Sequence, residues 1–430
     1  MPVSVNNTTE DFKETEIGLI PAEWDVESIG ALFELKQGKA MSPKTRRGIA
    51  PRPFLRTSNV LWGRVDLSTV DRMDFSDAEV GQLSLKAHDL LVCEGGEVGR
   101  TAMWRGEIEG CAYQNHLHRL RSRRQDVWPE FYMYWMQAGF LLLGVYAGRE
   151  TKTTIANLSG ARLGSFPVPV PPLPEQRQIS HVLSTIQRAI EVQDRVIVAA
   201  KELKRSLMER LFTYGPGPEP APTKETEIGE IPEAWEVVKF EEVADFRLGR
   251  TPRRDEESYW DNSRYPWVSI ADMADCGIVR YTREKVSQLA FDEVFNGRIV
   301  PRGTLLMSFK LTIGRTSVLG TDAFHNEAII SIYPGDRLLK EYLLYFLPTL
   351  QFSNYYDTVV KGKTLNKSKI SILPIALPPL AEQREISGIL QAADRNIEAE
   401  ERRASALKAL FRSTLHQLMT GRLRVTDLEV

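Results

Sequence analysis

The strongest constraint on the fold of this chain is an internal repeat, in which one long sequence unit occurs twice. Residues 14–21 read ETEIGLIP, and residues 225–232, which lie 211 positions later (225 − 14), read ETEIGEIP. Towards the other end of each copy, PPLPEQRQI at 171–179 matches PPLAEQREI at 378–386, with an offset of 207 (378 − 171). A period of about 210 residues far exceeds the roughly 20 to 50 residues of solenoid and propeller repeats. Each copy is therefore predicted to be a whole domain plus a connector, and the two copies should be related by pseudo-two-fold symmetry.

Between these fixed ends the two copies diverge. Residues 38–169 match residues 249–377 only at scattered positions, such as the GRT triplets that begin at Gly99 and Gly314. A shared fold with different surfaces suggests one chain that recognises two different things.

Size and composition agree with a two-domain soluble protein. At 430 residues the chain exceeds the roughly 250 to 300 residues of a single core, and its 42% apolar and 26% charged residues are ordinary for globular proteins. The N-terminus does not resemble a signal peptide and no apolar run approaches 18 residues, so a cytoplasmic location is expected. The three isolated cysteines form no CxxC pair, which predicts neither a disulfide framework nor a zinc site.

The net charge of −2 conceals local basic segments. Residues 39–65 and 358–381 contain no Asp or Glu but several Lys and Arg, and four arginines lie within 119–124. Because affinity for phosphate follows the contacted charges rather than the total, such segments are compatible with nucleic-acid binding. For any one of these segments taken alone, a solvated loop is the favoured explanation.

Each copy is predicted to be an α+β domain. Short runs of Val, Leu, Ile and Phe bounded by Gly and Pro, such as LFELKQG at 32–38 and ADFRLGR at 244–250, favour strands of a twisted, mostly antiparallel sheet. Aromatic-rich segments at 128–143 and 338–356 have helical spacing and should pack on that sheet as core.

A long helix is predicted to close each copy. It should begin after a proline-rich exit, at Glu175 and Glu382, whose carboxylates suit a helix N-terminus. Apolar residues then recur in steps of four and three over roughly 39 residues, or about 58 Å of helix, which favours an antiparallel coiled coil that acts as a spacer with a sheet domain at either end; two ordinary amphipathic core helices fit the same spacing. The predicted helix-pairing residues are Ile179, Leu183, Ile186, Ile190, Ile197, Leu207, Leu211, Ile386, Leu390, Ile397, Leu407, Phe411 and Leu418.

The predicted domain order follows from these elements. The chain is predicted to contain a first α+β domain at 1–170, a spacer helix at 171–214, a Pro/Gly-rich linker at 215–224, a second α+β domain at 225–377, a second spacer helix at 378–421 and a tail at 422–430.

No catalytic motif is present in the sequence. The segment that ends in Gly362, Lys363 and Thr364 resembles a phosphate-binding loop, but Asp357 stands where the first glycine of that loop belongs. The GGEVG segment at 95–99 lies between strand-like runs, so a hairpin turn is favoured over a nucleotide cradle. The histidines show no HExxH spacing, and neither GxSxG nor an Asp/Asn-Pro-Pro-aromatic methylation signature occurs.

Taken together, these features resemble the specificity subunit of type I restriction-modification systems. The resemblance is carried by EIGLIPAEW and EIGEIPEAW at the start of each copy, by the two PPLxEQRxI segments, and by LFTYG and LMTGR at the helix ends. It covers nearly the whole chain.

The resemblance implies a non-catalytic subunit with two target-recognition domains held apart by two helical regions. In this family each recognition domain reads one half of a bipartite, asymmetric target in double-stranded DNA, and the helices dock two methyltransferase (modification) subunits, which recruit the restriction (nuclease/translocase) subunits. No cofactor is expected on this chain itself; S-adenosylmethionine belongs to the methyltransferase. Two rival readings remain, a coiled-coil scaffold that binds only proteins and a self-sufficient DNA enzyme, although the latter needs catalytic motifs that the sequence lacks.

Residue type and predicted loop position indicate the candidate DNA contacts, since Lys and Arg hold phosphates while Arg, Asn and Gln can pair with base edges. Arg100 and Arg315 recur in both copies, which favours a shared structural or phosphate role for them. In the first copy the candidates are Lys39, Lys44, Arg46, Arg47, Arg52, Arg56 and Asn59, with Arg119 and Lys152 as weaker members. In the second copy they are Arg250, Arg253, Arg254, Lys310, Lys361, Lys363 and Lys367.

Overall fold

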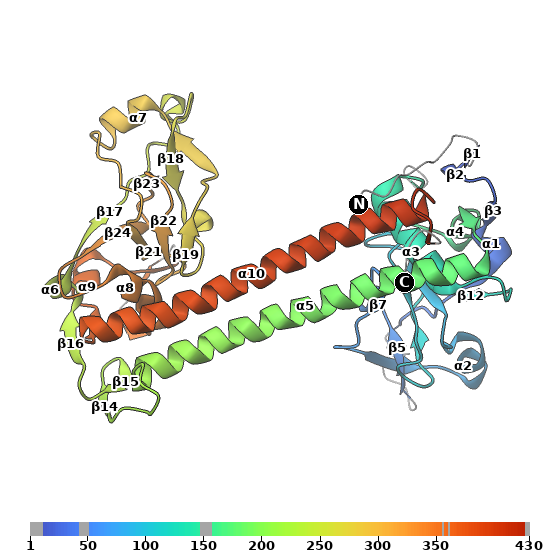
Figure 1. Cartoon of the computed structure of the whole chain (residues 1–430), viewed down its shortest axis with the longest axis horizontal. Coiled ribbons are helices and arrows are strands. Elements are labelled where there is room, and N and C mark those ends of the chain that lie inside the picture. The colour runs from blue at the N-terminus through green and yellow to red at the C-terminus, as the bar shows by residue number, and fades with distance from the viewer. Residues whose placement is uncertain (1–11, 43–50, 147–156, 355–356, 360–361, 426–430) are drawn as a thin grey trace, which may run out of the picture. The chain divides into compact units, whose positions relative to one another are not determined.

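The chain separates into two compact units, each built around parts of two long helices (Figure 1). The computed structural model describes residues 12–42, 51–146, 157–354, 357–359 and 362–425. Unit 1 comprises residues 1–194 and 402–430, and unit 2 comprises residues 195–401. The unit boundaries therefore cut through the long helices α5 (Leu173–Tyr214) and α10 (Leu380–Met419) instead of following the two sequence copies.

Unit 1 contains a four-stranded antiparallel sheet in the order β10-β9-β12-β4 and a three-stranded sheet in the order β11-β5-β8. Strand pairs β1–β2, β3–β13 and β6–β7 complete the unit. Its strands are β1 (Phe12–Thr15), β2 (Gly18–Pro21), β3 (Asp25–Ser28), β4 (Phe33–Gln37), β5 (Pro51–Leu55), β6 (Val60–Leu61), β7 (Arg64–Val65), β8 (Asp71–Asp74), β9 (Leu90–Cys93), β10 (Thr101–Met103), β11 (Ala112–Tyr113), β12 (Leu117–Ser122) and β13 (Pro167–Val170). Its shorter helices are α1 (Ile29–Leu32), the 3₁₀ turn η3 (Thr57–Asn59), α2 (Asp77–Leu83), α3 (Pro129–Ala138), the π turn η4 (Gly139–Leu143) and α4 (Gly160–Gly164).

Unit 2 repeats this plan with a five-stranded sheet in the order β17-β24-β21-β22-β19 and a three-stranded sheet in the order β20-β18-β23. Its strands are β14 (Thr223–Thr226), β15 (Gly229–Pro232), β16 (Glu236–Lys239), β17 (Ala244–Leu248), β18 (Tyr265–Val268), β19 (Gly277–Val279), β20 (Glu284–Val286), β21 (Leu305–Ser308), β22 (Thr316–Leu319), β23 (Phe324–His325), β24 (Ile329–Pro334), β25 (Asp357–Val359), β26 (Gly362–Thr364) and β27 (Pro374–Leu377). Its helices are α6 (Phe240–Val243), η5 (Glu257–Tyr259), η6 (Ile270–Asp272), α7 (Gln288–Glu293), α8 (Lys340–Phe346), η7 (Leu347–Thr349), η8 (Phe352–Asn354) and α9 (Lys367–Ser371).

The predicted α+β class is confirmed. Most strand pairs are antiparallel, and the parallel ones among the described strands are β5–β11, β18–β23 and β19–β22. The GGEVG segment links the antiparallel strands β9 and β10, so the predicted hairpin turn is confirmed. Gly362, Lys363 and Thr364 form strand β26 of a hairpin with β25, not a loop that opens a helix.

The two aromatic-rich segments fold differently. The first forms α3, and residues such as Phe131 and Trp135 are buried in the core as predicted. The second was predicted as one helical segment over 338–356, but α8 ends at Phe346 and two short 3₁₀ turns follow. Pro348 lies just beyond this end, and its ring has no N–H to continue the helix.

Both units bury the ends of the long helices in their main apolar cores. In unit 1 this core includes Ile179 and Leu183 from α5 together with Leu415 and Leu418 from α10. In unit 2 the corresponding core takes up Leu211 and Phe212 from α5 with Ile386 and Leu390 from α10. Several predicted helix-pairing residues therefore pack into a sheet domain as well as along a helix pair.

Within each unit the two helices run antiparallel. In unit 2, Lys201 pairs with Glu401 at 2.6 Å and Lys204 pairs with Asp394 at 2.5 Å, so positions rise on α5 as they fall on α10. Among the seam residues away from the helix ends Ile397 is buried, and the others are half-buried: Ile186, Ile190, Ile197, Leu207, Leu407 and Phe411. The predicted helix starts are corrected by two residues, because α5 and α10 begin at Leu173 and Leu380, which places both predicted glutamates in the first turn.

Candidate nucleic-acid interface

The repeated sequence motifs meet each other in both units. The Trp24 indole Nε1 donates to Glu175 Oε2 at 3.0 Å, and Trp235 Nε1 donates to Glu382 Oε2 at 2.8 Å. The opening motif of each copy is thus tied to the first turn of that copy's long helix. Unit 1 adds Arg424, whose guanidinium donates to both Glu175 oxygens at 2.8 and 3.0 Å.

The glutamine that follows each of these glutamates fixes the aromatic helix. Gln176 and Gln383 are fully buried, and their Oε1 atoms accept from the backbone N–H of Trp128 and Leu339, each at 2.8 Å, just before α3 and α8. The Nε2 atoms donate to the proline carbonyls five residues upstream, each at 2.8 Å. The EQ pair of each PPLxEQRxI motif is therefore a framework device and not a ligand site.

The shared arginines Arg100 and Arg315 hold equivalent 3₁₀ turns. Arg100 Nη2 donates to the Thr57 carbonyl of η3 at 2.6 Å, and Arg315 Nη1 donates to the Ile270 carbonyl of η6 at 3.4 Å. Each follows a glycine with positive φ. These contacts favour the structural side of the role predicted for both arginines.

The predicted DNA-binding residues of unit 1 are largely engaged in local contacts. Lys39 lies 2.6 Å from Glu79 and donates to the Asp74 carbonyl at 2.9 Å, and its hydrogen bond is the largest cause of the lowered pKa of the Glu79 carboxyl. The side chain of Asn59 is buried and donates to two loop carbonyls, while Arg56 pairs with Asp71 at 2.9 Å and stays 43% exposed.

Arg119 is one position at which the interiors of the two units differ. Its side chain is only 2% exposed, and its guanidinium donates to Glu34 at 2.8 Å and to the Gln82 carbonyl at 3.0 Å. It occupies the strand position that Ser331 occupies in unit 2, because Arg119 pairs with Lys36 on β4 and Ser331 pairs with the equivalent Arg247 on β17. A buried arginine in one unit is thus replaced by a small hydroxyl in the other.

Of the remaining candidates of unit 1, Arg52 is the one within the described residues. Arg52 is exposed on β5. Lys44, Arg46, Arg47 and Lys152 lie outside the described residues.

In unit 2 the cationic residues after Gly249 are exposed but paired. Arg253 is 75% exposed and pairs with Asp255 at 2.8 Å, which raises the pKa of the guanidinium. Arg254 is 53% exposed, pairs with Glu284 through two hydrogen bonds of 2.5 and 3.0 Å, and stacks 4.0 Å from the ring centroid of Trp260. Both guanidiniums reach the surface, where a phosphate could compete with these exposed carboxylates.

A hollow of about 250 Å³ opens beside this segment. Its wall includes the exposed side chains of Arg247, Arg250 and Arg298, together with Ser331 and the buried His325. Burial lowers the pKa of His325 to about 4, so its imidazole is neutral at physiological pH and the positive charge at the hollow comes from the arginines. Polar walls with three guanidiniums suit an anionic or base-edge ligand.

Sequence reasoning found Arg250 but missed Arg247 and Arg298. Arg298 directly follows Asn296 and Gly297, which both have positive φ, so the Asn-Gly turn was the available sign of an exposed loop there. Arg247 stands on a strand, and nothing in its local sequence indicates that it faces a hollow.

The other candidates of unit 2 are spread over separate elements. Lys310 is half-buried with its Nζ 5.5 Å from the Phe309 ring centroid, and Lys367 is exposed at the start of α9. Lys363 lies on β26, and Lys361 lies outside the described residues.

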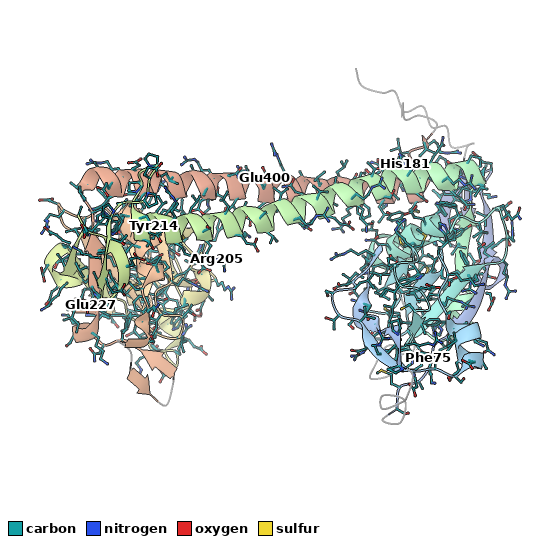
Figure 2. The ribbon with its side chains drawn as sticks, turned by 90° about the horizontal axis from the view of Figure 1, so that it is seen from below. Phe75, His181, Arg205, Tyr214, Glu227 and Glu400 are labelled. Atoms are coloured by element: carbon teal, nitrogen blue, oxygen red, sulfur yellow. The ribbon has the colours of Figure 1, made fainter. Side chains whose placement is uncertain are left out.

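Each unit has a part that lies away from its long helices (Figure 1), and in unit 1 this part carries the exposed Arg52 on β5. In unit 1, α2 and β5 lie on the side opposite α5, and Phe75, next to α2, is far from His181 of α5 (Figure 2). In unit 2, α7 and β18 lie away from α10 (Figure 1). Each of these parts has its own small apolar core, which contains Phe54 and Phe75 in unit 1 and Trp267 and Phe295 in unit 2.

The described part of the chain offers neither a metal site nor a reactive thiolate. Over residues 12–425 with the gaps given above, no group of His, Cys, Asp and Glu side chains could hold a metal ion. Burial raises the pKa of Cys93 to about 11 and that of Cys111 to about 12, so both thiols stay protonated at neutral pH. None of the described helices combines the length and apolar character needed to cross a bilayer.

Comparison with known proteins identifies this architecture. The type I restriction modification DNA specificity domain matches residues 21–200 and again residues 232–409. The chain belongs to the type I restriction-modification DNA specificity family. It is a non-catalytic specificity subunit whose general role is DNA target recognition, which confirms the prediction from the repeated motifs.

Two relatives match over nearly their full length. The putative type I restriction enzyme MjaX specificity subunit of Methanocaldococcus jannaschii is 25% identical, and the MjaVIII specificity subunit of the same organism is 24% identical, each with 97% of both chains covered. Among solved structures, the type I restriction-modification S subunit from M. genitalium has a TM-score of 0.55 at 14% identity, covering 92% of this chain and 96% of that one. A chain from a structure that describes complex assembly and conformational transition of the type I R-M system has a TM-score of 0.57 at 18% identity, with 94% and 99% covered. These structures share the fold.

Proposed function

We propose that this specificity subunit reads a bipartite, asymmetric DNA target, with one half-site for each unit, and that it docks two methyltransferase subunits, which in turn bring in restriction subunits. The observation that carries the proposal is that the framework is the same in both units while the outward chemistry differs. The Trp–Glu and EQ contacts recur in both, whereas Arg250 is exposed beside the hollow of unit 2 and its counterpart in the first copy, Lys39, is 16% exposed and paired with Glu79 at 2.6 Å. Unlike surfaces on like scaffolds are what two unlike half-sites require.

The contacts to DNA are proposed for the exposed cations of each unit. In unit 2 the arginines around the hollow, Arg247, Arg250 and Arg298, contact the backbone or base edges, joined by Arg253, Arg254, Lys310 and Lys367. In unit 1 the exposed Arg52 and Arg56 take this role. Asn59 and Arg119 support the loops from inside, because burial removes their side chains from any ligand.

The methyltransferase subunits are proposed to bind along the long helices. These helices expose Val192, Val196, Val198, Leu203 and Leu410 to between 41% and 59% of their surface, which is unusual for large apolar side chains. The methyl donor, S-adenosylmethionine, is held by the methyltransferase, so this chain contributes target choice and not chemistry.

The proposal is tested by mapping methylated sites in genomic DNA. Cells that express this chain with its neighbouring methyltransferase are compared with cells that express the methyltransferase alone. A new bipartite motif that appears only with this chain is the expected result. Its absence, with an assembled complex and an active methyltransferase, favours a coiled-coil scaffold that binds only proteins.

Exchange of one recognition surface separates the two half-sites. Replacing residues 38–169 with the same segment of another specificity subunit should change one half of the methylated motif and leave the other half and the spacing unchanged. A change in both halves contradicts the assignment of one half-site to each unit.

A further inference from the structure

The long helices carry two equivalent positions whose chemistry differs between the units. By the repeat offset, each residue of α5 corresponds to the residue 207 positions later on α10. Gln187 therefore corresponds to Asp394, and Lys204 corresponds to Phe411. The two units thus join their helices with different side chains at the same place.

Unit 2 has a charged junction, formed by Lys204, Asp394 and Tyr345. Lys204 Nζ lies 2.5 Å from Asp394 Oδ1, and the Tyr345 hydroxyl donates to Asp394 Oδ2 at 2.7 Å. Lys204 Nζ also lies 5.1 Å from the Tyr345 ring centroid. The side chains of Lys204 and Asp394 are only 14% and 29% exposed, so each charge depends on the other for compensation.

Unit 1 has an apolar junction at the equivalent place, formed by Phe411 and Tyr134, with the neutral Gln187 at the position that corresponds to Asp394. Tyr134 corresponds to Tyr345, because α3 and α8 begin 211 positions apart. The rings of Phe411 and Tyr134 meet edge to face with centroids 6.1 Å apart, and Phe411 packs against the main core of the unit. Gln187 is half-buried and neutral.

The neighbouring ion pairs do not differ in this way. Asp194 pairs with Lys408 at 3.0 Å in unit 1, and Lys201 pairs with Glu401 at 2.6 Å in unit 2. Asp194 corresponds to Glu401 and Lys201 to Lys408, so any combination of halves keeps an acid opposite a lysine. These exposed pairs stabilise the antiparallel arrangement without distinguishing one half from the other.

We propose that the charged and apolar junctions make the two halves of the chain select each other over a second copy of themselves. Two first halves, paired in the same antiparallel manner, place Lys204 beside Gln187 and Tyr134, with no carboxylate to compensate its charge. Two second halves place Asp394 beside Phe411. Both symmetric pairings leave a partly buried charge without an oppositely charged partner, whereas the native pairing leaves none. This cost of the symmetric pairings supplies the specificity. The inference concerns pairing within the chain and does not depend on the proposed DNA role.

The first test is a double-substitution cycle in the full chain. Lys204→Phe and Asp394→Gln should each lower the melting temperature, because each substitution leaves the charge of the other residue without a partner. The double variant recreates the apolar junction in unit 2 and should recover most of the loss. The reciprocal pair, Phe411→Lys and Gln187→Asp, should behave in the same way in unit 1. Losses that simply add in both double variants would overturn the proposal.

The second test addresses partner choice directly. A full-length chain in which residues 12–214 occur twice, joined by the native linker, should melt roughly 5 °C or more below the native chain. Lys204→Phe in both repeats, or Gln187→Asp in both repeats, should raise the melting temperature, although each of these changes destabilises the native chain. Asp194→Glu in both repeats is the matched control and should have no effect. A repeated chain as stable as the native one, or one that neither substitution improves, contradicts the selection.

Discussion

Arg298 is the residue at which the proposed DNA role can be tested most simply. Its side chain is exposed at the hollow of unit 2. Arg298→Ala should weaken DNA binding by the assembled complex and reduce the slope of log K against log salt by about 0.9, the value for one phosphate contact. Binding is measured across a salt series. Arg384→Ala, an exposed arginine on α10, is the control and should leave the slope unchanged.

His325 should make unit 2 sensitive to acid. Burial lowers its pKa in the folded state to about 4, below the unfolded value near 6.5, so the unfolded chain binds the proton first as the pH falls. The stabilisation is fully present above pH 6.5 and is lost between pH 6.5 and 4, by on the order of 3 kcal/mol. His325→Gln, which introduces the residue of the first copy, should flatten this part of the stability curve in denaturant titrations. If the slope of stability against pH between pH 6.5 and 4 is unchanged in this variant, His325 is not the group responsible.

Glu175 should matter more for stability than its counterpart Glu382. Glu175 is buried and receives hydrogen bonds from both Trp24 and Arg424, whereas the half-buried Glu382 has the Trp235 contact. Glu175→Ala should cost about 2 kcal/mol, because it removes the Trp24 hydrogen bond and one of the two carboxylates that pair with Arg424, the other being Glu23 at 2.7 Å, whereas Glu382→Ala should cost about 1 kcal/mol. Equal losses in chemical denaturation would contradict the role given to Arg424.

At the residue scale, sequence identified which side chains carry charge but not which of them are free to bind. Arg119 is neutralised by Glu34, 85 positions away, and Arg56 by Asp71, and such pairings depend on strand register, which local sequence does not specify. The framework role of the EQ pair was likewise hidden, although its repetition marked it as important.

Among the helices and strands, the long helices and the β9–β10 hairpin were the most predictable elements because a heptad pattern and a glycine-rich turn are local. The strand order was not predictable, since β9 lies between β10 and β12, and the register comes from side chains far apart in sequence. The break of α8 was readable from Pro348 alone.

Two glycines on or just after α10 should respond in opposite directions to substitution by alanine. Gly421 ends the helix with φ +65°, and a Cβ there would lie 2.2 Å from Pro21 Cγ, so Gly421→Ala should destabilise unit 1. Gly388 lies within α10 with nothing within 4 Å of an added Cβ, so Gly388→Ala should stabilise by up to about 1 kcal/mol through helix propensity. Thermal melts of the two variants check both signs, and a stabilised Gly421→Ala variant would show that the contact with Pro21 is absent.

In the whole molecule, each unit is completed by a helix end from the other sequence copy. Deleting residues 402–430 removes Phe411, Leu415 and Leu418 from the core of unit 1 but nothing from unit 2. Hydrogen exchange should therefore rise in α3 and β12, which end 264 (402 − 138) and 280 (402 − 122) positions before the cut, and stay unchanged in β21 and β24. Greater exchange in unit 2 than in unit 1 would be inconsistent with this organisation.

Sequence predicted two repeated domains but placed each helix wholly with its own copy. The heptad pattern could not show that Leu211 and Leu418 are also core residues of a sheet domain, because the pattern records only that one helix face is apolar.

The exchange of helix ends also sets an order of events during synthesis. The first segment of unit 1 ends at Asp194. The unit then lacks the helix end that begins at Arg402 until roughly 200 further residues have been translated. At about 5 to 20 residues per second, this interval lasts roughly 10 to 40 s. During this interval the nascent chain exposes the apolar surface of unit 1 that Leu415, Leu418 and Met419 later cover, so unit 1 is completed by a segment that is translated after the whole of unit 2.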